Sequence, residues 1–138
     1  MSPAIDHLQR ALAGALASRP AVGGFPHLAE SLRRAGVAFN RWVLPACQSL
    51  YVTEFGTVVM QGEPLGGGIQ EVAPFDEAAL IRALRRDQAG EGTFPEFLRA
   101  SWEAGVVGYE VDFGRRVVTY EGARGETYVE AYPAVDLP

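Results

Sequence analysis

The clearest pattern of hydrophobic and polar positions lies in the second half of the chain. Apolar residues recur there with helical spacing at Phe94, Phe97, Leu98 and Trp102. This spacing predicts an amphipathic helix of about three turns, which Gly105 ends as a left-handed residue. After the glycine the period changes to two, with apolar residues at Val107, Tyr109, Val111 and Phe113. The alternation predicts a half-buried strand.

Capping residues indicate where the helices begin. Thr93 and Glu96 match a capping box at the start of the helix just described. Asp76 is placed to cap an earlier alanine- and leucine-rich helix, and Asp6 is placed to cap a similar helix that ends before Pro20. Each half of the chain is therefore predicted to contain two helices.

Turn residues indicate three strands in each half. In the second half, hairpin turns at 114–115 and 122–125 lead into strands over 116–121 and 126–132. In the first half the pattern is noisier, and it predicts a helix over 25–35 followed by strands near 37–44, 50–54 and 57–61.

The two halves resemble each other at a constant offset. Residues 25–65 fall on residues 94–134 without a gap. The identical positions mostly begin or punctuate structure: Phe25 and Phe94, Pro26 and Pro95, Ala35 and Ala104, Gly36 and Gly105, Val37 and Val106, Tyr51 and Tyr120, Gly56 and Gly125, Pro64 and Pro133. Shared caps and turns predict a repeated structural unit.

The sequence therefore predicts an α+β fold with two internal repeats, each of two helices followed by three antiparallel strands. The 138 residues fit a single domain, 1–138, with repeats at approximately 5–65 and 75–134 and a glycine-rich joint over 62–74. We expect the helices to pack on one face of the sheet. Because three strands alone are marginally stable, we expect the two sheets to join or to share one core.

Composition and charge narrow the classes of partner. The net charge of -5 disfavours nucleic acid and anionic membrane surfaces. The single Cys47 has no partner for an internal disulfide and is interpreted as a small buried hydrophobic residue. We expect no signal peptide and no membrane span, and therefore a cytoplasmic protein.

A longer pattern in the second half matches a known family. An aromatic residue and Pro open a helix, Ala-Gly-Val closes it, and Tyr-containing strands with a Gly-Glu hairpin continue to a final Pro. The matching positions are Phe94, Pro95, Ala104, Gly105, Val106, Tyr109, Tyr120, Gly122, Gly125, Glu126, Glu130 and Pro133. With this pattern, residues 75–133 resemble a bacterial family of unknown function labelled phage-envelope-protein-like, which includes the YbcV-like proteins. The resemblance implies a fold but no established activity.

Motifs of known enzymes are missing from the sequence. It contains no nucleophile elbow, no P-loop and no dinucleotide-binding fingerprint. His7 and His27 have no Cys or His partner at the spacing of metal ligands, so we expect no metal and no cofactor.

Carboxylates and tyrosines of the predicted strands are the remaining candidates for a site. If the carboxylates gather on one face of the sheet, they would bind a cation or act as acid and base. If they are dispersed, they would form a solvated surface. The carboxylates are Glu110, Asp112, Glu121, Glu126 and Glu130. The tyrosines would either line a pocket or fill the core: Tyr109, Tyr120, Tyr128 and Tyr132. The candidate ligand or partner residues are Tyr109, Asp112, Tyr120 and Glu130.

The sequence favours a non-catalytic binding or interaction module, with any ligand held in a groove between the two lobes. The partner would be a small molecule or a protein, including a second copy in a homodimer. The alternative is a small carboxylate- or metal-dependent hydrolase or isomerase. A second alternative, a phage-related component, follows only from the family label.

Overall fold

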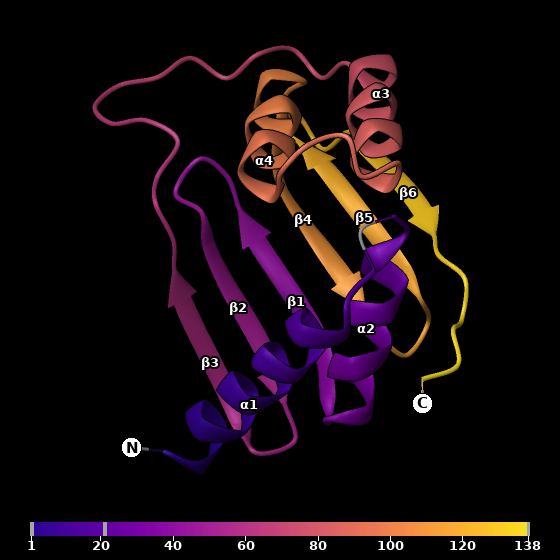
Figure 1. Cartoon of the computed structure of the whole chain (residues 1–138). Helices are drawn as coiled ribbons and strands as arrows, with labels where there is room; N and C mark the ends of the chain where they lie inside the picture. Colours follow the sequence, from indigo (N-terminus) through magenta and orange to yellow (C-terminus); the bar gives the residue numbers. More distant parts are fainter. Residues whose placement is uncertain (1, 21, 138) are drawn as a thin grey trace.

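The computed structural model describes residues 2–20 and 22–137. Within them, helix, helix and three strands follow one another twice (Figure 1). The first set is α1 (Pro3–Ser18), α2 (Gly24–Arg34), β1 (Val37–Val43), β2 (Gln48–Thr53) and β3 (Gly56–Gln61). The second set is α3 (Glu77–Gln88), α4 (Phe94–Glu103), β4 (Val106–Asp112), β5 (Val117–Gly122) and β6 (Thr127–Ala131). The predicted α+β class and element order are confirmed.

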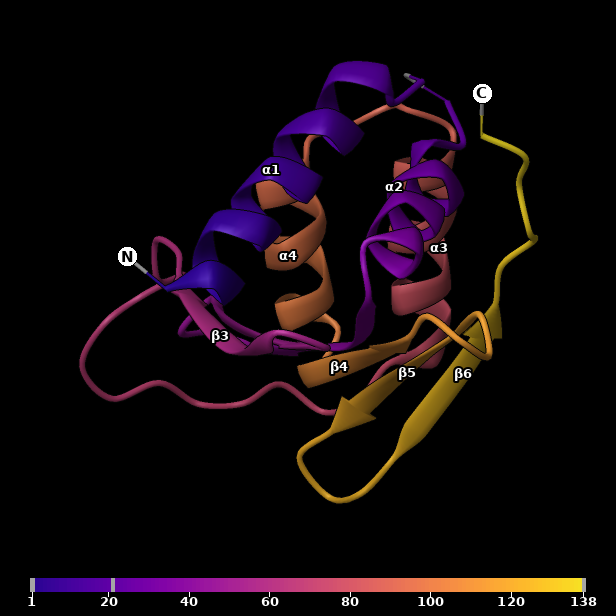
Figure 2. The ribbon, with the colours of Figure 1, turned by 90° about the horizontal axis from the view of Figure 1, so that it is seen from below.

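The strands form one six-stranded antiparallel sheet in the order β3-β2-β1-β4-β5-β6. Because β1 pairs with β4 at the centre, the three-stranded sheets of the two halves join edge to edge. The helices lie together on one face of the sheet, as expected (Figure 2). The other face carries no helix from the described part of the chain.

The central pairing brings equivalent positions of the two halves together. Arg41 lies opposite Glu110 in the β1–β4 register, and their separation of 69 residues is the offset between the halves. Shifted by the same offset, the bounds of β1 and β2 coincide with those of β4 and β5. The middle of the sheet is therefore an approximate twofold centre: β1 lies beside its counterpart β4, and the other strands follow in mirrored order on either side.

The predicted capping box at α4 is confirmed. Thr93 Oγ1 accepts a hydrogen bond from the Glu96 N–H at 3.3 Å, and the Glu96 carboxylate accepts one from the Thr93 N–H at 3.2 Å. Asp76 caps α3 by accepting a hydrogen bond from the Ala79 N–H at 3.0 Å. These helix starts depend on residues only three positions apart, which is why the sequence shows them.

The start predicted for the first helix is wrong. α1 begins at Pro3 rather than after Asp6, because Ser2 accepts a hydrogen bond from the Ile5 N–H at 3.2 Å. Proline suits the first helical turn, where its missing donor has no intrahelical acceptor.

Within the described residues, no helix has the length and apolar character needed to cross a membrane.

A β-bulge at the start of β4 changes which valine faces the helices. The register shifts directly after Val106, which is completely buried at 0% exposure, whereas Val107 is only half-buried. The prediction that Val107 shares the buried face is therefore wrong, because the extra residue reverses the alternation. Farther along the strand, Tyr109, Val111 and Phe113 are buried as predicted.

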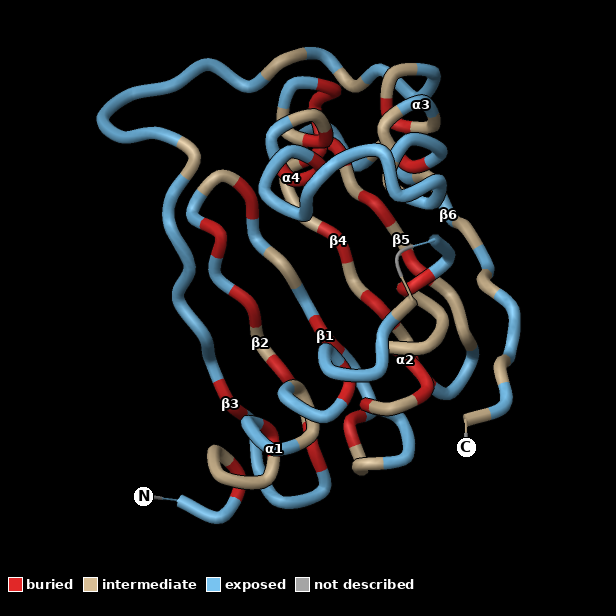
Figure 3. Tube along the Cα trace, in the orientation of Figure 1, coloured by how far each residue is buried: buried red, intermediate tan, exposed pale blue. Residues whose placement is uncertain are grey.

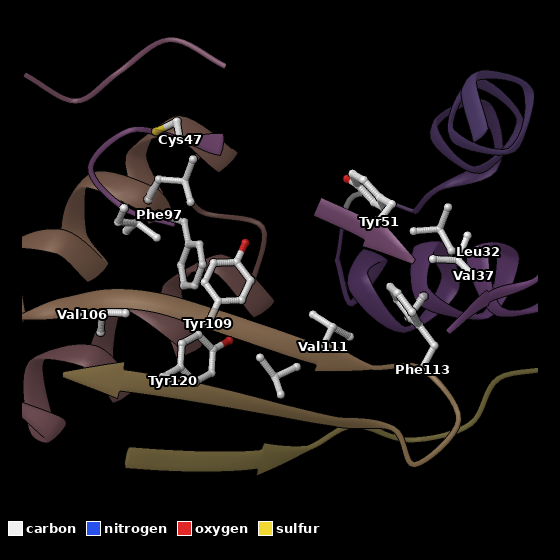
Figure 4. Packing of buried hydrophobic residues seen from close by; sticks show 14 of the residues in the cluster. Leu32, Val37, Cys47, Tyr51, Phe97, Val106, Tyr109, Val111, Phe113 and Tyr120 are labelled. Carbon is white, nitrogen blue, oxygen red and sulfur yellow. The ribbon is translucent and has the colours of Figure 1, made fainter. Parts of the chain in front are cut away.

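The hydrophobic core fills the space between the helices and the sheet. Figure 3 shows buried positions alternating with more exposed ones along the central strands. The core combines residues of both halves, including Tyr51 and Val37 from the first and Tyr109 and Phe113 from the second (Figure 4). Cys47 is buried in the same cluster, which agrees with its interpretation as a small hydrophobic residue.

Candidate functional site

A row of aromatic side chains crosses the helix-facing side of the sheet. Trp42, Tyr109, Tyr120 and Tyr128 lie opposite one another on β1, β4, β5 and β6. Along the row, successive ring centroids are 6.1, 5.4 and 6.3 Å apart. Phe97 of α4 covers Tyr109 at a centroid distance of 6.4 Å. Aromatic contacts therefore connect one helix with four strands.

Two tyrosine hydroxyls in this row form no hydrogen bond with a described protein group. Tyr109 and Tyr120 are 7% and 5% exposed, which confirms the expected burial of Tyr109. In the described part of the chain, neither hydroxyl forms a hydrogen bond with another protein group. Nor are they sealed from solvent, unlike the unpaired atoms His27 Nδ1 and Ser101 Oγ. The two hydroxyls therefore border space that a water or a ligand atom can reach.

Burial keeps both hydroxyls protonated. It raises the pKa of Tyr109 well above 10.0, and the neighbouring Tyr120, Tyr51 and Asp87 raise it further. Burial also raises the pKa of Tyr120, where Glu130 and Asp87 add to the effect. Figure 4 shows the hydroxyls of Tyr109 and Tyr51 directed toward the boundary between the two halves. Both tyrosines of the row can therefore donate a hydrogen bond near neutral pH.

Asp87 places a second kind of polar group, a carboxylate, in the helix layer over the sheet. It lies half-buried near the end of α3. Burial raises the pKa of Asp87, and the positive charge of Arg19 lowers it in part. Within residues 2–20 and 22–137, its carboxylate has neither a hydrogen bond nor an ion pair. Among the described residues, Asp87 is therefore an acceptor without a donor.

A cavity of about 190 Å³ opens between α3 and α4. Its walls are Ala83, Arg86, Asp87, Gly92, Thr93, Glu96, Phe97 and Ala100. One of these residues, Phe97, links the cavity to the tyrosine row, because its ring packs on that of Tyr109. Sites for drug-sized ligands measure about 300–1,000 Å³. This space, called the α3–α4 cavity below, suits a smaller molecule.

A second hollow of about 690 Å³ lies between residues 71–75 and the turn that joins β5 to β6. A loop and a hairpin turn line it, and most of these residues are exposed. It lacks the buried, unpaired polar groups found beside the α3–α4 cavity. The smaller space therefore has the more specific chemistry.

The Glu130 side chain links the edge strand β6 to α3 by hydrogen bonds. Its carboxylate accepts hydrogen bonds from Arg85 Nη1, Gln88 Nε2 and the Tyr128 hydroxyl, each at 2.7 Å. Burial raises the pKa of Glu130, but these hydrogen bonds outweigh it and hold the pKa below the ordinary 4.5. With three donors around it, Glu130 holds the helix in place beside the tyrosine row.

The structure brings together three of the four residues predicted as a site. Tyr109, Tyr120 and Glu130 lie on the helix-facing side of the sheet, whereas Asp112 lies on the uncovered side. Asp112 accepts a hydrogen bond from the Arg115 N–H at 3.0 Å and so closes the hairpin turn. It cannot share a ligand with the other three across the sheet.

The other carboxylates of the strands are also dispersed. Glu110 pairs with Arg41 on the uncovered face at 2.9 Å, and Glu126 accepts a hydrogen bond from the Arg124 N–H at 2.8 Å. Within the described residues, no three His, Cys, Asp or Glu side chains are grouped so as to hold a metal ion.

Four residues around the tyrosines were not among the sequence candidates: Arg85, Asp87, Gln88 and Phe97. The sequence did contain a signal for one of them. Asp87 follows Leu80 by seven positions and Leu84 by three, so it extends the apolar stripe of α3. A carboxylate on the core-facing side of a helix requires a partner or a function.

Comparison with known proteins gives matches without an assigned activity. Residues 19–130 match a family described as "Protein of unknown function (DUF1398)". The chain is 55% identical over 136 residues to an uncharacterized protein of Mycobacterium tuberculosis, covering 99% of this chain and 83% of that protein. An uncharacterized protein of Mycobacterium bovis matches with the same identity and coverage.

Proposed function

The chain belongs to the DUF1398 family of proteins of unknown function, and we propose that it is a non-catalytic module that binds a small molecule in the α3–α4 cavity. One observation carries the proposal. The half-buried Asp87 carboxylate lines this cavity without a hydrogen bond or ion pair in the described residues, and Phe97 of the cavity wall packs on Tyr109, whose buried hydroxyl also forms no hydrogen bond there. Because buried polar groups normally form hydrogen bonds, a bound molecule would supply the missing partners.

The chemistry of the cavity favours a neutral or cationic ligand that carries hydrogen-bond donors. Asp87 and Glu96 place two carboxylates in the wall, and Arg86 is already 3.8 Å from Glu96. The net charge of -5 also disfavours anions. Phe97 offers aromatic surface in the cavity wall, against which a flat or cationic group packs well. A small amine or amide meets these requirements.

A thermal-shift screen tests the proposal with small amines, amides and polyols, and with carboxylates for comparison. A ligand at a hundred times its Kd adds about 2.7 kcal/mol of stability. We expect amines or amides to stabilise the protein, and Asp87→Asn and Tyr109→Phe to weaken that effect. Tyr132→Phe is the control, because its ring packs on Phe25 away from the cavity. Binding that is unchanged in Asp87→Asn and Tyr109→Phe would contradict the proposed site.

A second comparison separates the ring of Tyr109 from its hydroxyl. Tyr109→Ala removes a buried aromatic ring and should reduce the free energy of unfolding by about 3–5 kcal/mol. Tyr109→Phe removes only an unpaired hydroxyl and should leave the stability of the free protein nearly unchanged. Urea unfolding measures both. A large loss in the phenylalanine variant would mean that the hydroxyl has a structural partner.

The alternative function is a small hydrolase or isomerase that uses carboxylates or a metal ion. A thermal-shift measurement with divalent metal ions tests it. If this alternative holds, a metal ion should stabilise the wild type and should not stabilise Glu130→Gln. The dispersal of Glu110, Asp112 and Glu130 over both faces of the sheet favours the binding module instead.

The second alternative, a phage-related component, rests on the resemblance of residues 75–133 to the phage-envelope-protein-like family. Mass spectrometry of purified phage particles from a host that encodes the chain is the direct test. Particles that lack the chain would remove this alternative.

A further inference from the structure

The uncovered face of the sheet carries an apolar surface. Its most exposed apolar side chains are Phe39 at 38%, Val43 at 45%, Val59 at 53% and Val129 at 55%. They belong to β1, β3 and β6 and point away from the side on which Figure 2 shows the helices. Large apolar side chains left exposed on a face that no described helix covers are a feature of protein interfaces.

Two opposite charges mark the centre of this face. Arg41 Nη2 lies 2.9 Å from Glu110 Oε2, and the two side chains are 56% and 33% exposed. They stand on β1 and β4, the two middle strands, at the approximate twofold centre of the sheet. The face therefore has exposed apolar side chains on β1 and on the two edge strands, and on its middle strands a pair of opposite charges beside Asp112.

We propose that this face binds the same face of a second copy of the chain in a twofold-symmetric dimer. Aligned sheets pack face to face with their strands within about 30° of one another. A twofold axis parallel to the strands reverses the strand order, so that β1 covers β4 of the second copy. Arg41 then faces Glu110 of the second copy, and Val59 meets Val129 at the opposite edge. Each contact occurs twice, as a symmetric interface requires.

The positions of Arg41 and Glu110 favour one of the two orientations in which the faces can stack. With the twofold axis perpendicular to the strands, each strand would cover the same strand of the second copy. Arg41 would then face Arg41, and Glu110 would face Glu110, which places like charges together in a partly desolvated interface. The arrangement with the axis parallel to the strands avoids this repulsion and keeps the apolar edges in contact.

The size of the face indicates how strongly the copies associate. Six strands about 4.8 Å apart and about six residues long give a face of roughly 500–600 Å² per copy. The total area is therefore just above the roughly 1,000 Å² expected of a specific interface. We expect a reversible dimer whose population rises with protein concentration.

Sedimentation equilibrium over a range of protein concentrations tests the dimer. Val59→Lys and Val129→Lys should each raise the dimer dissociation constant at least about tenfold, because a charge replaces an apolar contact at the interface. Leu16→Lys is the matched control, since Leu16 is 61% exposed on α1, on the helix side. A monomer at all concentrations, or dissociation caused by Leu16→Lys alone, would overturn the proposal.

A charge-exchange experiment tests the stacking itself. Arg41→Glu and Glu110→Arg should each be monomeric, because both central positions then carry the same sign. Mixed together, the two variants should form a heterodimer, since every cross-pair is again opposite in sign. Circular dichroism melting of each variant checks that it is folded. Folded variants that do not associate on mixing, or that form homodimers as well as the wild type does, would overturn the proposed arrangement.

Discussion

Gly105 shows how one residue combines two structural demands. It follows α4 with a φ of +86°, in the left-handed region predicted for it. A Cβ atom there would lie 2.6 Å from the Pro74 carbonyl oxygen and 2.7 Å from the Phe75 Cα. Gly125 has a similar φ of +84°, but nothing lies within 4 Å of its Cβ position. The two glycines share a backbone conformation and differ in the space around them.

This difference predicts unequal costs for the same substitution. Gly125→Ala should reduce the free energy of unfolding by about 1–2 kcal/mol, the cost of a left-handed alanine. Gly105→Ala should cost about 1–3 kcal/mol more, because the methyl group also meets backbone atoms of residues 74 and 75. Urea unfolding of both variants gives the comparison. Equal losses would mean that residues 74 and 75 move aside at no cost.

At the scale of an element, α2 contains an ion triad around one buried carboxylate. Glu30 is only 6% exposed, and it accepts hydrogen bonds from Arg33 at 2.7 and 2.8 Å and from Arg34 at 2.9 Å. The hydrogen bonds from Arg33 are the largest effect on the pKa of Glu30, burial opposes them, and Arg34 assists. Together they lower the pKa from 4.5 to about 2.

A pKa that is lower in the folded protein makes stability depend on pH. The ionised Glu30 stabilises the fold fully above pH 4.5, and this contribution is lost as the pH falls toward about 2. Glu30→Gln should therefore be less stable than the wild type at pH 7, with a difference that shrinks between pH 5 and pH 2. Urea unfolding at several pH values measures it, with the exposed Glu91→Gln as control. A difference that stays constant with pH would contradict the ion triad.

At the scale of the whole molecule, the two halves share one sheet and one core. The central pairing extends beyond the strand ends, where the Leu44 N–H bonds to the Val107 carbonyl at 2.9 Å and the Phe113 N–H bonds to the Ala38 carbonyl at 3.1 Å. On the helix side, the Gly23 N–H bonds to the Gln88 carbonyl at 3.2 Å. Neither half can separate without exposing core residues of the other.

The joined sheet predicts a single cooperative unfolding transition. Trp42 lies in β1 of the first half, where its ring also packs on Phe94 and Tyr109 of the second, and Trp102 lies in α4, so the two report on different parts of the molecule. In Trp42→Phe and in Trp102→Phe, the fluorescence of the remaining tryptophan should change at the same urea concentration as the circular dichroism. Two separate midpoints within one variant would show that the halves unfold independently.

The sequence by itself determined the features that depend on near neighbours along the chain. Caps such as Thr93, helix ends such as Gly105 and the alternation of Tyr109, Val111 and Phe113 follow from contacts or periods spanning a few residues. These local signals were sufficient for the element order and the α+β class. They failed at Asp6, because Ser2 caps the helix four residues earlier.

Only the tertiary structure decided how distant segments meet. The sequence left open whether the sheets join, because the β1–β4 pairing links positions 69 residues apart and is marked by no turn between them. The bulge at Val106 reversed one alternation, since a single extra residue changes the face of its neighbours. The contact of Glu130 with Arg85 also needed the tertiary structure, because these two residues lie 45 positions apart in the chain. A side chain's face depends on strand register, and its neighbours depend on packing between elements that are far apart in the chain.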